Sequence, residues 1–133
     1  MSHIPEWADK YIRIPFKKKA RGLDACDCLG LVQLIYEDEL GIVLPDYVHT
    51  DPDEKELTGI LITERKKEWI KLSKPEPFSL IILNIMNHPI HLGIVLNDES
   101  MIHTMKNKYS SIERYTGLSW KNRIEGFYKW PCM

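Results

Sequence analysis

The sequence predicts an α+β fold, with helices in the first half of the chain and an antiparallel sheet in the second half. Apolar residues recur at helical spacing over residues 27–40, whereas the chain from residue 77 onward contains short β-branched and alternating runs. Helices followed by a run of strands are typical of an α+β fold with segregated layers. The 133 residues contain no internal repeat or Gly/Ser-rich linker, so we expect one domain over residues 1–133.

The clearest helix is expected over residues 27–40. Leu31 and Ile35 lie four residues apart and belong to an apolar stripe at the helical period. Asp27 is suited to cap the N-terminus, and Gly41 is suited to the left-handed position that ends a helix. Both ends of this helix are therefore predicted from the sequence.

A more polar helical region is expected over residues 53–71, which begin acidic and end basic, as the helix dipole favours. We interpret it as one or two surface helices, with Trp69 and Ile70 anchoring the end.

Strands are expected over residues 78–85, 91–96, 101–105 and about 124–128. Residues 97–100, Asn-Asp-Glu-Ser, predict a turn, so the second and third of these strands should form a hairpin.

Composition excludes several classes of function. Lys and Arg total 18 against 19 Asp and Glu, and this net charge of −1 lacks the basic surplus of a nucleic-acid-binding protein. The longest apolar run, Leu80–Leu83, is far shorter than the roughly 20 residues of a membrane-spanning helix. The N-terminus has no basic segment followed by an apolar one, so we expect synthesis in the cytoplasm without a signal peptide. The basic run at residues 17–21 indicates either a solvated loop or contact with an anionic polymer.

Cys28 is a candidate nucleophile. It follows the predicted cap Asp27, so its thiol should lie at the first turn of the helix, where the positive dipole end lowers a thiol pKa. The charge of Asp27 opposes this effect, and a basic partner is needed. The alternative is that Cys28 is a small buried hydrophobic residue.

His91 and His103 are the candidate basic partners. His91 is expected to open its strand, and His103 lies on the return strand of the same hairpin, so both imidazoles can share one face of the sheet. One ring could then take the thiol proton while the other fixes its tautomer. The alternative is that each is a half-exposed strand residue.

A zinc site is the competing interpretation. Cys26, Cys28, His88 and His91 offer two thiols and two imidazoles, but both pairs are spaced more tightly than is usual for zinc, so no metal is expected. Cys26 is then an adjacent loop residue, and Cys132 has no expected role. Because the sequence contains no glycine-rich phosphate loop, no cofactor is expected either.

Several segments resemble the NlpC-type cell-wall peptidases, and most closely their phage-tail branch. Residues 27–32 (Asp-Cys-Leu-Gly-Leu-Val) and 40–47 (Leu-Gly-Ile-Val-Leu-Pro-Asp-Tyr) resemble the motifs around the nucleophile. Residues 91–95 (His-Leu-Gly-Ile-Val) and 101–103 (Met-Ile-His) resemble the family's histidine strands, and residues 120–129 contain its closing Trp, Arg and Gly-Phe-Tyr. The segments occur in the family's order along nearly the full chain.

The resemblance implies a papain-like fold and hydrolysis of peptidoglycan stem peptides, commonly between D-glutamate and the diamino acid. It implies that Cys28 is the nucleophile, His91 the general base and acid, and His103 the orienting residue, with a thioester intermediate. The backbone N–H of Cys28 would belong to the oxyanion hole. Asp27 and Leu29, its neighbours, are expected near the substrate.

The chain departs from the family in several places. Phe16 replaces a tyrosine whose hydroxyl lies in the site of many relatives, and Leu29 replaces a Trp or Ser. Residues 18–20, Lys-Lys-Ala, replace a Gly-Gly pair, and residues 78–79, Phe-Ser, replace a Gly-Asp turn. Phe16 and Leu29 should therefore alter substrate contacts without removing the three catalytic residues.

The resemblance is compatible with a phage-tail peptidase, acting within a virion tail, and with a secreted antibacterial effector that reaches the cell wall or periplasm after delivery. Tail, secretion-apparatus or immunity proteins are the corresponding partners. Two alternatives remain: a non-catalytic binding or structural module of such an apparatus, and a papain-like acyl hydrolase or transferase that acts on another amide or a lipid.

Overall fold

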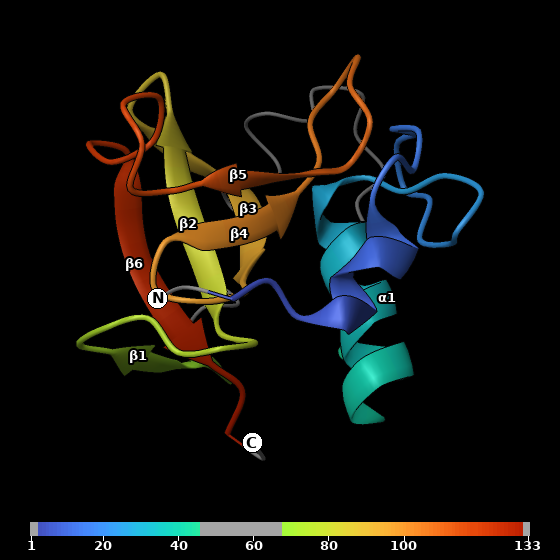
Figure 1. Cartoon of the computed structure of the whole chain (residues 1–133), viewed down its shortest axis with the longest axis horizontal. Coiled ribbons are helices and arrows are strands. Elements are labelled where there is room, and N and C mark those ends of the chain that lie inside the picture. Colours follow the sequence, from blue (N-terminus) through green and yellow to red (C-terminus); the bar gives the residue numbers. More distant parts are fainter. Residues whose placement is uncertain (1–2, 46–67, 132–133) are drawn as a thin grey trace.

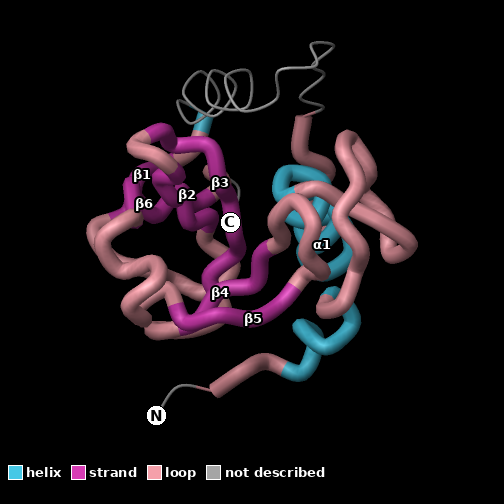
Figure 2. The backbone as a smooth tube through the Cα atoms, turned by 90° about the horizontal axis from the view of Figure 1, so that it is seen from above, coloured by secondary structure: helices cyan, strands magenta, loops and turns pink. Residues whose placement is uncertain are grey.

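The protein consists of a helical layer packed against an antiparallel sheet, as the sequence predicts (Figures 1 and 2). The computed structural model describes residues 3–45 and 68–131. Their elements are η1 (Glu6–Tyr11), α1 (Cys28–Leu40), β1 (Ile70–Leu72), β2 (Leu80–Ile85), β3 (His88–Val95), β4 (Ser100–His103), β5 (Ser111–Arg114) and β6 (Ile124–Lys129). The strand order is β1-β6-β2-β3-β4-β5, so β1 and β5 are opposite edges. In the described part of the chain, no helix has both the length and the apolar character needed to cross a bilayer.

Both predicted ends of α1 are confirmed. Oδ1 of Asp27 accepts a hydrogen bond of 2.6 Å from the backbone N–H of Gly30, which satisfies one donor of the first turn. Gly41 adopts φ +66°, and its N–H donates to the carbonyl of Glu37 at 3.1 Å. The helix therefore starts at Cys28, and the candidate nucleophile occupies its first turn.

Gly30 allows this start to pack against the preceding loop. A Cβ atom built at Gly30 would lie 2.0 Å from the carbonyl oxygen of Ala20, which is backbone and cannot move aside cheaply. Any side chain there would push α1 away from the loop. The backbone N–H of Asp27 also donates to Ala20 at 3.1 Å, so the two segments are joined on both sides of Cys28.

The hairpin formed by β3 and β4 has the predicted turn. Oδ1 of Asn97 accepts from the backbone N–H groups of Glu99 and Ser100 at 2.9 and 2.8 Å. The predicted start of β3 was wrong by three residues, because the strand begins at His88 and His91 lies within it. His88 and Pro89 extend β3 because they pair with the end of β2 beyond a β-bulge.

Other boundaries differ from the prediction. Residues 53–67 of the expected polar helices lie outside the described residues. Ile70 and Lys71 were expected to end a helix, but they form β1 by pairing with β6. Ile70 is 45% exposed, contrary to its expected role as an anchor, whereas Trp69 is buried as expected. Among the described residues, η1 and β5 were not predicted, since each is short and has no clear periodicity.

Phe78 occupies the turn where the family resemblance has glycine. Its φ of +67° is in the left-handed region, which disfavours a large side chain. The ring stacks on Trp7 with centroids 4.7 Å apart, and Oγ of the next residue, Ser79, donates to the carbonyl of Glu76 at 2.6 Å. These contacts hold the turn before β2 without the usual glycine.

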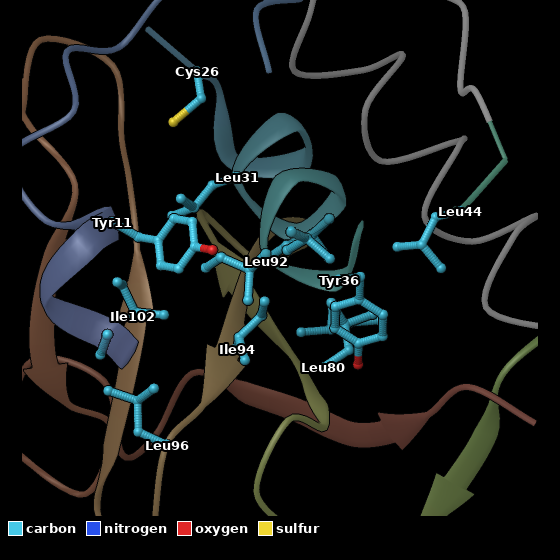
Figure 3. Close-up of a cluster of buried hydrophobic side chains, with 14 of the residues drawn as sticks. Tyr11, Cys26, Leu31, Tyr36, Leu44, Leu80, Leu92, Ile94, Leu96 and Ile102 are labelled. Atoms are coloured by element: carbon cyan, nitrogen blue, oxygen red, sulfur yellow. The ribbon is translucent and has the colours of Figure 1, made fainter. Parts of the chain in front are cut away.

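The main core lies between α1 and one face of the sheet (Figure 3). Leu31 and Tyr36 of α1 lie in one cluster with Tyr11 of η1 and with Leu92 and Ile94 of β3. Residues alternate along a strand, so the intervening residues of β3 face the other side of the sheet. That opposite face carries a second cluster, made of Ile81, Leu83, Val95, Met101, Tyr115 and Trp120.

Candidate active site

The two predicted histidines lie in contact on this second face of the sheet. Gly93 of β3 pairs with His103 of β4, so His91 and His103 are diagonal neighbours. Nε2 of His91 lies 2.7 Å from Nδ1 of His103, at hydrogen-bonding distance, and both side chains are buried. The prediction that the hairpin brings these two imidazoles together is confirmed.

Gly93 leaves room for this contact. A Cβ atom at Gly93 would lie 3.2 Å from the carbonyl oxygen of Ile102 and 3.3 Å from Cβ of His103. A side chain would therefore crowd His103 and separate the rings. Close contact with β4 therefore favours glycine at position 93, the glycine of the predicted motif.

Glu113 of β5 extends the hydrogen-bond chain and was missed from the sequence. Its Oε2 accepts a hydrogen bond from Nε2 of His103 and another, of 3.1 Å, from Nε1 of Trp120. The ring of Trp120 also stacks on His91, with centroids 5.5 Å apart and an angle of 21° between the planes. A lone glutamate on a short strand gives no sequence signal, and the pairing of β5 with β4 is what brings it to His103.

The carboxylate determines where the protons lie. A carboxylate accepts only, so Nε2 of His103 carries the proton and Nδ1 of His103 is the acceptor. Nε2 of His91 then donates to His103, and Nδ1 of His91 is left unprotonated. An unprotonated ring nitrogen is what a general base needs.

Cys28 lies against the strand that carries His91. The helix α1 packs on β3, and hydrogen bonding to the Cys28 sulfur from the backbone N–H of Leu92 lowers the thiol pKa. Leu92 directly follows His91. Since β4 pairs with β3 only from Gly93 onward, the sulfur contacts β3 just before the segment that β4 pairs with. The Cys28 thiol therefore lies close to the backbone of the residue that follows His91 in β3.

The resting thiol is protonated. Burial, and secondarily the charge of Asp27, raises the pKa of Cys28 to about 12 despite the backbone N–H groups near the sulfur. The expected opposition of Asp27 is confirmed, and the helix N-terminus does not overcome burial.

Both histidines are neutral at neutral pH. Burial, and then the proximity of His103, lowers the pKa of His91 to about 3. Burial also lowers the pKa of His103, although Glu113 acts in the opposite direction and Lys108 adds to the lowering. The Cys28 thiol and both imidazoles are thus neutral at rest.

Two of the remaining predicted site residues flank Cys28 in the chain, and the third pairs with Cys26. Asp27 caps the helix and also accepts a 2.8 Å hydrogen bond from the backbone N–H of Lys19. Leu29 packs against the main core and is half-buried, and Phe16 forms a bridge with Cys26. Their contacts with a substrate stay a prediction.

The residues of the competing zinc interpretation are all described. Cys26 is fully buried, and burial raises its pKa to about 12, whereas His88 is exposed at the start of β3. Within residues 3–45 and 68–131, no three or more His, Cys, Asp or Glu side chains are grouped so that they could hold a metal ion. Cys132 lies outside the described residues.

Comparisons with known proteins identify relatives of the same fold. An NLP/P60-family protein from Staphylococcus aureus subsp. aureus Mu50, described as similar to a lipoprotein, has a TM-score of 0.65 and 19% identity, over 92% of this chain and 38% of that chain. The NlpC/p60 domain of the peptidoglycan hydrolase SagA has a TM-score of 0.63 and 16% identity, over 92% of this chain and 91% of that chain. NlpC2 from Trichomonas vaginalis has a TM-score of 0.65 and 15% identity, over 93% of this chain and 43% of that chain.

At these identities the structural likeness establishes the fold, and the chain spans less than half of the Staphylococcus and Trichomonas chains. A comparison with curated protein sequences found no match. The model of the NlpC/P60 family matches residues 13–129, which are nearly the whole chain and include Cys28, His91 and His103. The chain belongs to the NlpC/P60 family.

Proposed function

We propose that this chain is a cysteine peptidase that hydrolyses peptide bonds in the stem peptides of peptidoglycan. Membership of the family supports a cell-wall hydrolase, and one relative of the same fold is a domain of a peptidoglycan hydrolase. The observation that carries the proposal is the hydrogen-bonded pair His91–His103, together with a thiol, Cys28, that lies at the first turn of α1 and near the backbone N–H of the residue after His91.

The reaction begins with a proton transfer inside this group. Nδ1 of His91 takes the proton of the Cys28 thiol as the sulfur attacks the scissile carbonyl carbon, because neither group is charged at rest. The imidazolium then gives that proton to the departing amine, and a thioester remains on Cys28. His91 next removes a proton from water, whose oxygen attacks the thioester and releases the acid and the thiol. His103 and Glu113 hold the tautomer of His91 throughout, as positioning residues.

The negative oxygen of each tetrahedral intermediate needs hydrogen-bond donors. The backbone N–H of Cys28 serves as one of them, since it lies at the N-terminus of α1, where the helix dipole favours negative charge. The neighbours of Cys28 in the chain are Asp27 and Leu29, and Phe16 pairs with Cys26. Phe16 has no hydroxyl, so the donor that many relatives have here must come from elsewhere.

The bond between D-glutamate and the diamino acid is the proposed target, and the proposed setting is a phage-tail-like or secreted cell-wall hydrolase. The test is incubation of purified peptidoglycan of several chemotypes with wild type and Cys28→Ala, followed by mass analysis of the soluble products. Cys132→Ala controls for loss of a thiol elsewhere. Fragments from wild type and Cys132→Ala alone would support the proposal and identify the bond. Equal cleavage by Cys28→Ala would refute it.

A non-catalytic module of a tail or secretion apparatus is the second candidate. Phe16 and the protonated state of Cys28 favour it, because both weaken the machinery of a peptidase. This candidate predicts that folded wild type binds peptidoglycan but releases no fragment from any chemotype. An acyl hydrolase or transferase would instead leave peptidoglycan uncut, and its cysteine would form a thioester with the acyl group of a lipid or of another amide.

A further inference from the structure

A pocket of about 530 Å³ opens between the loop before α1 and the loop after β4. We call it the lysine pocket; its lining residues are Pro15, Phe16, Lys17, Lys18, Lys106, Asn107, Lys108 and Tyr109. Half of these are lysines, and none of the eight described residues that line the pocket is acidic. This is a local positive charge on a chain whose net charge is −1.

The backbone holds the two loops together, so the lysines do not meet by chance. Pro15 forms an antiparallel bridge with Tyr109, and in Figure 1 the orange loop after β4 lies beside the blue loop before α1. Ser110 fixes the junction, because its N–H donates to the carbonyl of Ile14 at 2.9 Å and its hydroxyl accepts from the N–H of Ile14 at 2.8 Å.

Both loops of the lysine pocket are tied to segments that carry candidate catalytic residues. The backbone N–H of Lys17 donates to the carbonyl of Cys26 at 3.2 Å, two residues before Cys28. The other loop starts directly after His103, and the charge of Lys108 contributes to lowering the pKa of His103. The pocket is therefore close enough to His103 for one of its lysines to act on that imidazole.

Lysines from two joined loops repel one another, and a bound anion relieves that repulsion. The volume matches a small-ligand site rather than the track of a long polymer. Phe16 and the exposed ring of Tyr109 add apolar surface for the carbon skeleton of a ligand.

We infer that the lysine pocket is a substrate subsite that binds carboxylate groups of the stem peptide next to the scissile bond. The inference rests on the proposed function and adds a preference to it. A stem peptide with free carboxylates binds more tightly than the same peptide with those groups converted to primary amides. The preference weakens as salt rises, because exposed charge pairs are screened.

The test measures binding separately from cleavage. Cys28→Ala is titrated calorimetrically with a synthetic stem tetrapeptide in its free-acid and amidated forms, at low and at high salt. The same titrations are made after adding Lys17→Gln and Lys106→Gln, one lysine from each loop and neither in contact with a catalytic residue. Lys74→Gln, which follows β1 at the opposite edge of the sheet, is the matched control.

We expect the free acid to bind about 10-fold more tightly than the amide, and the Lys17/Lys106 double variant to lose most of that ratio, since an exposed charge pair contributes up to about fivefold. Lys74→Gln should stay within about twofold of its parent. Equal affinities for acid and amide, or an unchanged ratio in the double variant, would overturn the inference. Cleavage by wild type without a carboxylate preference would leave the proposed function in place, whereas carboxylate binding without cleavage would remove the function and keep the subsite.

Discussion

Glu113 accepts a hydrogen bond from Nε2 of His103, the ring nitrogen on the side away from His91. The carboxylate thereby sets the tautomer of His103, and His103 sets that of His91. Control over the base thus comes from β5, the edge strand beyond the hairpin that carries both histidines.

Glu113→Gln should lower kcat roughly 10- to 100-fold and leave KM nearly unchanged, because loss of the correct tautomer impairs the base without removing it. An amide can donate to Nε2 of His103, which would reverse both hydrogen bonds and place a proton on Nδ1 of His91. Glu113→Asp should recover part of the rate, because it keeps the charge. Steady-state kinetics with a pH profile of kcat checks this. A Gln variant within twofold of wild type at every pH would show that Glu113 is structural.

Asp27→Asn should lower the pKa of the Cys28 thiol, because the charge of Asp27 is the second cause that raises it. The amide oxygen can still cap the N–H of Gly30, so α1 should stay folded. The measurement is the rate of alkylation of Cys28 as a function of pH, with circular dichroism as the control for folding. A titration curve unchanged from wild type would contradict the electrostatic account.

Acid should destabilise the protein through its buried histidines. The folded-state pKa of His91 is about 3, below the ordinary value of 6.5, so the unfolded chain binds more protons between these pH values. The contribution to stability is complete above pH 6.5 and is lost as pH falls toward 3, at up to about 1.4 kcal/mol per pH unit. The free energy of unfolding, measured with urea at several pH values from 7 to 4, should fall less steeply with decreasing pH in His91→Gln than in wild type. His88→Gln, at an exposed position, is the control and should keep the pH dependence of wild type. The same pH dependence in all three proteins would refute the role of His91 in acid destabilisation.

Gly30→Ala should destabilise the fold by at least about 3 kcal/mol, because its Cβ would lie 2.0 Å from the carbonyl oxygen of Ala20. Gly22→Ala, in the loop that carries Ala20, is the control, since a Cβ there meets nothing within 4 Å. Chemical unfolding of the two variants measures the difference. Similar stabilities would mean that the loop and α1 separate without cost.

The sequence by itself determined the features that depend on neighbouring residues. Helical spacing and end signals located α1 with both caps at Asp27 and Gly41. A turn signal placed His91 and His103 on adjoining strands, and antiparallel pairing at this spacing leaves them few positions except diagonal contact. Helical periodicity followed by strand patterns predicted the α+β fold, and the motifs in their order along the chain predicted the family.

The tertiary structure decided what depends on long-range pairing. Glu113 reaches His103 because β5 pairs with β4, and Trp120 reaches both Glu113 and His91 by packing on the same face of the sheet. Burial reversed the expected effect of the helix end on Cys28, because desolvation of a thiolate costs more than the dipole and backbone N–H groups return. The lysine pocket likewise joins two loops that are about 90 residues apart in the chain. Local sequence patterns record none of these distances, since burial and contact depend on which segments the fold packs together.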